Sequence, residues 1–152
     1  MLYNAEHYPD PTACDAMKNI QQSLPLQYTI NGEPRTKKNS QRIFYRKGQV
    51  PFIAPSKAYK EYERQALWQL RPRPRQPIQK PVAVKCVFYM KTKRKVDLVN
   101  LLEAVCDILV TGNILADDNS SIVVSHDGSR VLYDKNNPRA EIIITETDNQ
   151  GV

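Results

Sequence analysis

Acidic and amide side chains recur along residues 96–110 at a spacing that would place them on one side of a helix. At about 100° per residue, the leucines of the same stretch, with Val105 and Ile108, fall within an apolar arc of roughly 120° on the other side. The segment is therefore expected to be a helix with one face in the core. Its polar side would carry Asp97, Asn100, Glu103 and Asp107.

Two further acids, Asp117 and Asp118, follow in a turn that could fold back towards this helix. Carboxylate oxygens without nearby histidine or cysteine are the ligands that Mg²⁺ and Mn²⁺ prefer. Such ions supply a hydroxide-like nucleophile and stabilise the leaving oxygen when a phosphodiester is hydrolysed. The simpler alternative is a solvated helix face, with Asp97 favoured near the helix start by the dipole. His7 and His126 lie far apart in sequence and predict neither a zinc site nor a histidine base.

Charge is divided unevenly along the chain, whose net charge is +6. Residues 33–95 carry 18 basic residues against three acids, whereas residues 97–148 carry three basic residues against ten acids. A basic half joined to an acidic half is typical of a polyanion-binding surface beside a carboxylate cluster, although two solvated faces would give the same pattern.

The length and composition indicate one ordinary globular domain. A chain of 152 residues has the size of a single domain, and no apolar run approaches the roughly 18 residues of a membrane span. Its three cysteines are odd in number and widely spaced, so a disulfide framework is not expected and a cytoplasmic location is. Residues 1–26 read as an N-terminal appendage with a short helix at about 12–22, and residues 27–148 as the domain.

Periodicity and turn signals place the elements of this domain. Helices are expected at 57–70, capped by Ser56, and at 96–110, ended by Gly112, and the proline-rich stretch 71–81 would be a loop. Strands are expected at 27–30, 43–45, 50–53, 82–90, 122–124, 131–133 and 139–145, with 43–53 as a hairpin and 131–133 as a return strand after the Asp127-Gly128 turn. These elements predict an α+β fold with a mixed sheet and two main helices. Tyr45, Tyr59 and Tyr62 could stack on bases or simply pack.

Four segments also carry a family likeness, in order along the chain. They are Gly32-Glu33-Pro34 through Lys37-Lys38-Asn39-Ser40, Ser56 to Tyr62, Asp97-Leu98-Val99-Asn100-Leu101 through Asp107 to Asp117-Asp118-Asn119, and Asn137-Pro138-Arg139. Over about residues 28–146 the chain resembles the RusA family of Holliday junction resolvases, small bacterial and phage endonucleases. The resemblance implies a homodimer that cuts four-way DNA junctions by paired symmetric nicks, with Mg²⁺ or Mn²⁺, in recombination and repair.

The resemblance also assigns site residues. Asp97 matches the first catalytic aspartate of the family, Asp118 the later one, Asp117 its neighbouring acid and Asn100 the amide after the motif. The chain departs from the pattern in two places: Val99 stands where the family usually has a second aspartate, and Glu103 where it often has a lysine. We expect Glu103 to restore the acid count one helical turn along, because it lies on the same polar side as Asp97.

The sequence-based hypothesis is therefore a structure-selective endonuclease. Asp97, Glu103 and Asp118 would be catalytic and would hold the metal with Asp107 and Asp117, while Asn100 would orient a ligand, water or phosphate. Phosphate contacts are expected from Lys37, Lys38, Arg42, Lys93, Arg94 and Lys95. Two alternatives remain: a junction-binding protein made inactive by Val99, and a basic RNA-binding or assembly module, against which the acidic side of the 96–110 helix argues.

Overall fold

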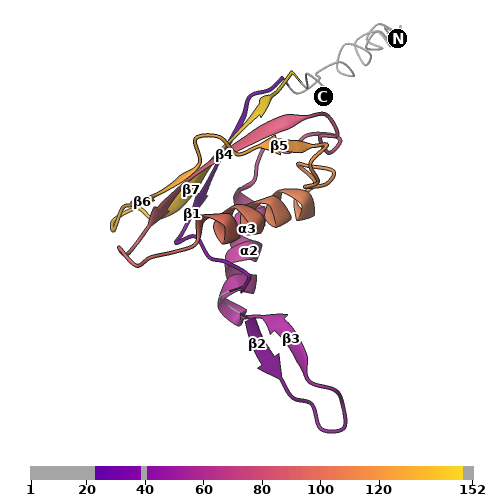
Figure 1. The fold of residues 1–152 in the computed structure, drawn as a ribbon, viewed down its shortest axis with the longest axis vertical. Coiled ribbons are helices and arrows are strands. Elements are labelled where there is room, and N and C mark those ends of the chain that lie inside the picture. Colours follow the sequence, from indigo (N-terminus) through magenta and orange to yellow (C-terminus); the bar gives the residue numbers. More distant parts are fainter. Residues whose placement is uncertain (1–22, 39–40, 149–152) are drawn as a thin grey trace, which may run out of the picture.

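A five-stranded mixed sheet with two helices on one face forms the body of the protein, and a separate two-stranded hairpin extends from it (Figure 1). The computed structural model describes residues 23–38 and 41–148. The helix expected at 12–22 lies outside the described residues. The elements are β1 (Leu26–Asn31), β2 (Gln41–Phe44), β3 (Phe52–Pro55), α2 (Lys57–Gln69), β4 (Val82–Met90), α3 (Leu98–Thr111), β5 (Val123–Ser125), β6 (Arg130–Tyr133) and β7 (Arg139–Glu146).

Strand β4 is the centre of the sheet. It pairs antiparallel with β7, which in turn pairs antiparallel with β1 at the edge. On its other side β4 pairs in parallel with two short strands, β5 beside Val82–Ala83 and β6 beside Val87–Met90. Parallel neighbours need a crossover connection, and α3 supplies it between β4 and β5.

The core lies between this sheet and the two helices. Alternate residues of β4, namely Val82, Val84, Cys86, Phe88 and Met90, are buried on the face that α2 and α3 cover. The opposite face of the sheet carries partly exposed side chains such as Lys85 and Tyr89. The period-2 pattern predicted for 82–90 is confirmed, because one face of the strand is core and the other meets solvent.

Helix α2 begins as the sequence predicts. The hydroxyl oxygen of Ser56 accepts a hydrogen bond from the backbone N–H of Tyr59 at 3.2 Å, which caps the helix. Tyr59, Tyr62 and Ala66 are buried at helical spacing. Two of the three tyrosines considered for base stacking are thus core residues, and only Tyr45 is exposed.

Helix α3 starts two residues later than expected, at Leu98, and Asp97 is its N-cap. The helix ends at Thr111 with Gly112 as C-cap, as predicted, but the left-handed residue that follows is Asn113, with φ of 57°. A β-carbon on Gly112 would lie 3.3 Å from Leu70 Cδ1, so close packing of the two helices favours glycine here.

Two strand predictions are corrected. The hairpin strands lie at 41–44 and 52–55, in the register Ile43 to Ile53, so its loop is longer than expected. Residues 130–133 do not return beside 123–125, because both segments pair in parallel with β4. The turn at 127–128 therefore joins two strands along one edge of β4 rather than the arms of a hairpin.

The described residues nevertheless form one small α+β domain with a mixed sheet and two helices, as predicted. Among these residues, none of the helices combines the length and apolar character needed to cross a membrane.

Candidate functional site

Asp97 begins the candidate site and also holds the start of α3. Its Oδ1 accepts hydrogen bonds from the backbone N–H groups of Val99 at 2.9 Å and Asn100 at 3.4 Å. An N-cap of this kind stabilises a helix by about 0.5–2 kcal/mol. The structural role that the sequence offered as the simpler alternative is thus present, and the side chain remains exposed.

Glu103 and Asp107 continue from Asp97 along the outer side of α3, and we call these three residues the acidic face. Glu103 is exposed and Asp107 half-buried, whereas Leu101, Val105 and Ile108 are in the core. Asn100 is half-buried on the same helix. The polar side predicted from the 100° spacing is confirmed, except that Asp97 caps the helix instead of lying within it.

Two lysines from the loop after β1, Lys37 and Lys38, meet the acidic face, and we call the loop that carries them the lysine loop. Lys38 Nζ lies 2.8 Å from Glu103 Oε2, and Lys37 Nζ lies 3.4 Å from Asp107 Oδ2. The hydrogen bond to Glu103 raises the pKa of Lys38, with a smaller contribution from the charge of Asp97. These ion pairs are solvent-exposed, so water and salt screen them and each is weak. The loop is therefore held on the helix by ion pairs in which another anion can take the place of Glu103 or Asp107.

The turn that carries Asp117 and Asp118 is anchored behind α3. Ile114 and Leu115 are buried, and their backbone N–H groups donate to the carbonyl of Leu109 at 2.9 and 3.2 Å. Asp117 accepts from Asn119 Nδ2 at 2.7 Å and from the N–H of Asp118 at 2.8 Å, and these hydrogen bonds lower its pKa.

One buried thiol responds to charges from both this turn and the acidic face. Burial, with smaller contributions from the negative charges of Asp118 and Asp107, raises the pKa of the Cys106 thiol to about 12. The hydrogen bonds of Ile114 and Leu115 to the carbonyl of Leu109 bring the start of this turn back to the end of α3. The return of Asp117 and Asp118 to the acidic face stays a prediction.

The donor types suit a hard divalent cation, but their arrangement does not make a metal site. Within residues 23–38 and 41–148, no group of three or more histidine, cysteine, aspartate or glutamate side chains is placed to hold a metal ion. Glu103 and Asp107 face lysine ammonium groups instead, Asp97 accepts hydrogen bonds from the first turn of α3, and Asp117 accepts from its own turn. As arranged, the carboxylates do not fit a bound ion, and we derive no chemical step from one.

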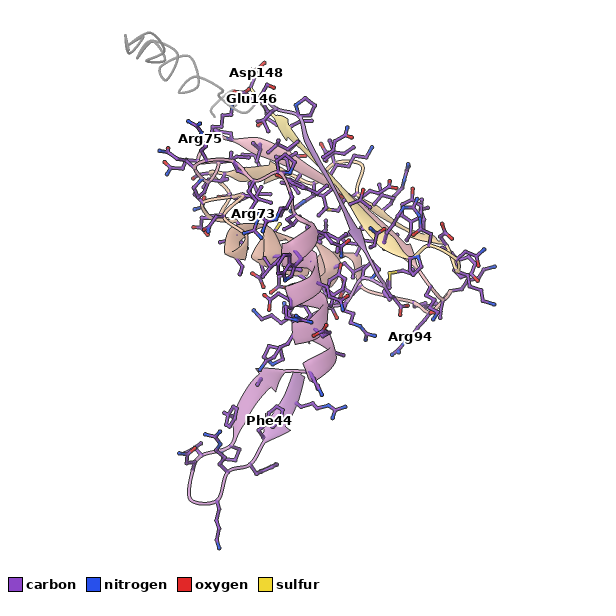
Figure 2. The ribbon with its side chains drawn as sticks, turned by 180° about the vertical axis from the view of Figure 1, so that it is seen from behind. Phe44, Arg73, Arg75, Arg94, Glu146 and Asp148 are labelled. Atoms are coloured by element: carbon purple, nitrogen blue, oxygen red, sulfur yellow. The ribbon has the colours of Figure 1, made fainter. Side chains whose placement is uncertain are left out.

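The remaining predicted phosphate contacts are spread over two other surfaces. Lys93, Arg94 and Lys95 are exposed in the loop between β4 and α3, with Arg94 pointing away from the body (Figure 2). Lys93 Nζ lies 5.2 Å from the centre of the Tyr133 ring. Arg42 lies on β2 in the projecting hairpin, so the structure does not bring it together with the acidic face.

Tyr59, which the sequence offers for base stacking or for packing, is a fully buried residue whose hydroxyl has no hydrogen-bond partner among the described residues. Burial raises its pKa, and the charges of Glu63, Asp107 and Glu103 add to this effect. Its apolar helix position was recognisable from spacing, but nothing in the sequence indicated that its hydroxyl would lie behind the acidic face.

The family motif pieces at 32–34 and 137–139 meet beside β7. The N–H of Gly32 donates to the carbonyl of Pro138 at 3.0 Å. Arg139 contacts Asp134 at 3.0 Å and Glu141 at 2.8 Å, and its guanidinium lies 3.7 Å from the centre of the Tyr89 ring. These contacts fix the start of β7 and the loop that leads to the lysines, so this part of the motif has a structural role.

One known protein family matches most of the chain. The model of the endodeoxyribonuclease RusA family matches residues 31–145, which is well over half of the chain and includes every candidate site residue. Among curated proteins, none matches the chain. The match extends from the lysine loop through α3 to the end of β7, and on its extent this chain belongs to the RusA endodeoxyribonuclease family.

Proposed function

We propose that this protein is a structure-selective DNA endonuclease that resolves four-way junctions by paired symmetric nicks, acts as a homodimer and requires Mg²⁺ or Mn²⁺. Family membership supports junction-resolving nuclease activity in general. The finer statements on the ion, the substrate geometry and the dimer are our proposal.

One observation carries the proposal: the lysine loop lies against the acidic face inside the region that the family model matches. A nuclease has to hold a phosphate chain next to its carboxylates, although the two repel each other. Lys37 and Lys38 meet this need, because each is already within 3.4 Å of an acid of the face. Since the pairs are exposed and weak, a phosphate can compete for the lysines while they stay beside α3.

The proposed residue roles follow the sequence-based hypothesis. Asp97, Glu103 and Asp118 are the catalytic acids, with Asp107 and Asp117 as further ligands and Asn100 as an orienting amide. The metal requirement rests on the family, whose members are metal-dependent nucleases, because the described carboxylates do not form a metal site. Glu103 would supply the carboxylate that is missing at position 99, where the chain has valine. Both residues lie on α3, and Val99 is 69% exposed.

The first test is cleavage of a synthetic mobile four-way junction, with linear duplex of the same sequence as control, in Mg²⁺, in Mn²⁺ and with chelator. We expect paired nicks in the junction alone, lost with chelator and with Asp97→Asn. This substitution is a sharp control, because asparagine caps a helix as well as aspartate does and therefore removes the charge without removing the cap.

A second variant tests whether Glu103 compensates for Val99. We expect Glu103→Gln to lose activity as Asp97→Asn does. Full activity of Glu103→Gln beside an inactive Asp97→Asn would contradict the compensation and return Glu103 to the role of a partner for Lys38.

A second function is favoured by a specific observation: Val99 offers no ligand, and the described acids form no metal cluster. In this alternative the protein binds junctions without cutting them. Tight junction binding with no cleavage in either metal would support it, and restoration of cleavage by Val99→Asp would identify the missing carboxylate as the cause.

A further inference from the structure

The β2–β3 hairpin extends beyond the start of α2, away from the sheet and its two helices (Figure 1). Its two strands pair with each other, and Phe44 and Phe52 stack across them with ring centres 5.6 Å apart. A two-stranded hairpin by itself is at best marginally stable in water. This hairpin is therefore suited to a contact outside its own chain.

The hairpin concentrates exposed apolar side chains. It carries six of the eleven large hydrophobic residues that are exposed among the described residues, and Tyr45 and Val50 in its loop are 78% and 84% exposed. Figure 2 shows Phe44 on the hairpin, far from Arg73, Arg75 and Arg94 on the body. Contiguous exposed apolar surface of this kind marks an interaction site. The six residues are Ile43, Phe44, Tyr45, Val50, Phe52 and Ile53.

Charge identifies the partner. Residues 41–55 contain Arg42, Arg46 and Lys47 and no acid. In a two-fold contact with a second copy, the same patch would meet itself, so three cations would face three cations. A polyanion neutralises them instead, and aromatic rings between cations are the combination that holds unstacked bases of nucleic acids.

We propose that the hairpin is a base-stacking surface, in which Tyr45 stacks on an unstacked DNA base while Arg46 and Lys47 contact the adjoining phosphates. Bases within a duplex arm have their faces covered by their neighbours, so only unpaired bases and those at the branch point of a junction can be bound this way. The inference deepens the proposed function, on which it rests, by assigning recognition of the branch point to this hairpin.

The test measures binding with chelator present, so that no cleavage is needed. Junctions carry the fluorescent base 2-aminopurine at the branch point or within an arm, and linear duplex and a single-stranded oligonucleotide serve as further ligands. We expect Tyr45→Ala to weaken binding of the junction and of the single strand about 5- to 150-fold and to abolish the branch-point fluorescence change. Duplex binding should be unchanged, and Tyr45→Phe should bind as the wild type does.

Trp68→Ala is the matched control, because Trp68 is an aromatic residue that is 70% exposed but lies on α2, outside the hairpin. It should bind every ligand as the wild type does. Equal binding of the junction and the single strand by Tyr45→Ala and the wild type would overturn the inference. The inference would also be overturned if Tyr45→Ala and Val50→Ala both changed the oligomeric state in sedimentation and left DNA binding unaffected, because the hairpin would then be a contact between protein chains.

Failure of the proposed function gives a different result. A wild type that binds duplex and junction equally, and cuts neither, would refute junction resolution. In that case the single-strand measurements still decide whether the hairpin stacks on bases, because they depend on neither branching nor cleavage.

Discussion

At the scale of single residues, two buried tyrosines differ in one hydrogen bond. Tyr28 Oη donates to the carbonyl of Pro72 at 2.9 Å, whereas Tyr59 Oη has no partner among the described residues. An unpaired buried hydroxyl costs free energy, and a paired one contributes about 1 kcal/mol. Tyr59→Phe should therefore raise the free energy of unfolding by about 1 kcal/mol, and Tyr28→Phe should lower it by about as much.

Urea unfolding of the two variants measures this difference. Equal destabilisation by both would contradict the prediction and would mean that the Tyr59 hydroxyl has a partner that the described residues do not include. Because Tyr59 lies behind the acidic face, Tyr59→Phe should also be assayed for junction binding, which we expect to be unchanged.

Residue-scale predictions from the sequence were right where they depended on helical spacing. The 100° period placed Glu103 and Asp107 on the outer side of α3 and Leu101 and Leu109 in the core. The partners of these acids could not be predicted, because Lys37 and Asp107 are 70 residues apart in sequence and meet only through the fold. Charge patterning indicated that a basic and an acidic surface exist, but not that they touch.

At the scale of elements, the turn before β7 depends on one carboxylate. Asp134 accepts from the backbone N–H groups of Asn136 and Asn137, both at 3.1 Å, and from Arg139 at 3.0 Å. The hydrogen bond from Asn137 is the largest of several causes that lower the pKa of Asp134. Since the folded pKa lies below the unfolded one, the stabilisation is present above about pH 4 and is lost as the pH falls through the folded value.

Asp134→Asn should therefore lower stability at neutral pH and flatten the loss of stability below about pH 4. Thermal unfolding between pH 2 and pH 7 measures both effects. Asp127→Asn, which removes an exposed acid from the turn between β5 and β6, is the matched control for the change in net charge. An acid profile of Asp134→Asn that is parallel to that of the wild type would contradict the prediction.

The first turn of α3 offers a second prediction at this scale. It contains no acid, although Val99 is exposed there, next to the positive end of the helix dipole. Val99→Asp should stabilise the protein by about 0.3–1 kcal/mol, and Val99→Lys should destabilise it by a similar amount. Urea unfolding at low salt separates the two, and the difference should shrink as salt screens the dipole. Equal stabilities would mean that the charge of Asp97 already saturates this effect.

Elements were predicted well from the sequence when their signals were local. Ser56 and Gly112 mark helix ends, and the alternation in β4 marks a strand. The pairing of β6 was missed, because an Asp-Gly turn is equally compatible with a hairpin and with two strands that follow one edge of β4. Pairing partners depend on the whole sheet, which local signals do not describe.

At the scale of the whole molecule, the uneven charge predicts how DNA binding responds to salt. Residues 33–95 carry a net charge of +15, and their exposed cations include Lys93, Arg94 and Lys95 beside the start of α3. Each phosphate contact releases counterions, which gives the plot of log binding constant against log salt concentration a slope of about −0.9 per contact on duplex DNA. The proposed DNA contacts should therefore produce a steep slope that does not depend on base sequence.

Arg94→Ala should weaken DNA binding for all sequences alike and reduce the magnitude of this slope by about 0.9, because it removes one phosphate contact. Lys80→Ala is the matched control: Lys80 also carries a positive charge, but its Nζ lies 3.0 Å from Glu146 Oε1 at the far end of β7. It should leave the slope unchanged. Fluorescence anisotropy between 50 and about 200 mM salt measures both variants. Equal slopes for Arg94→Ala and the wild type would show that Arg94 makes no phosphate contact and would contradict the prediction.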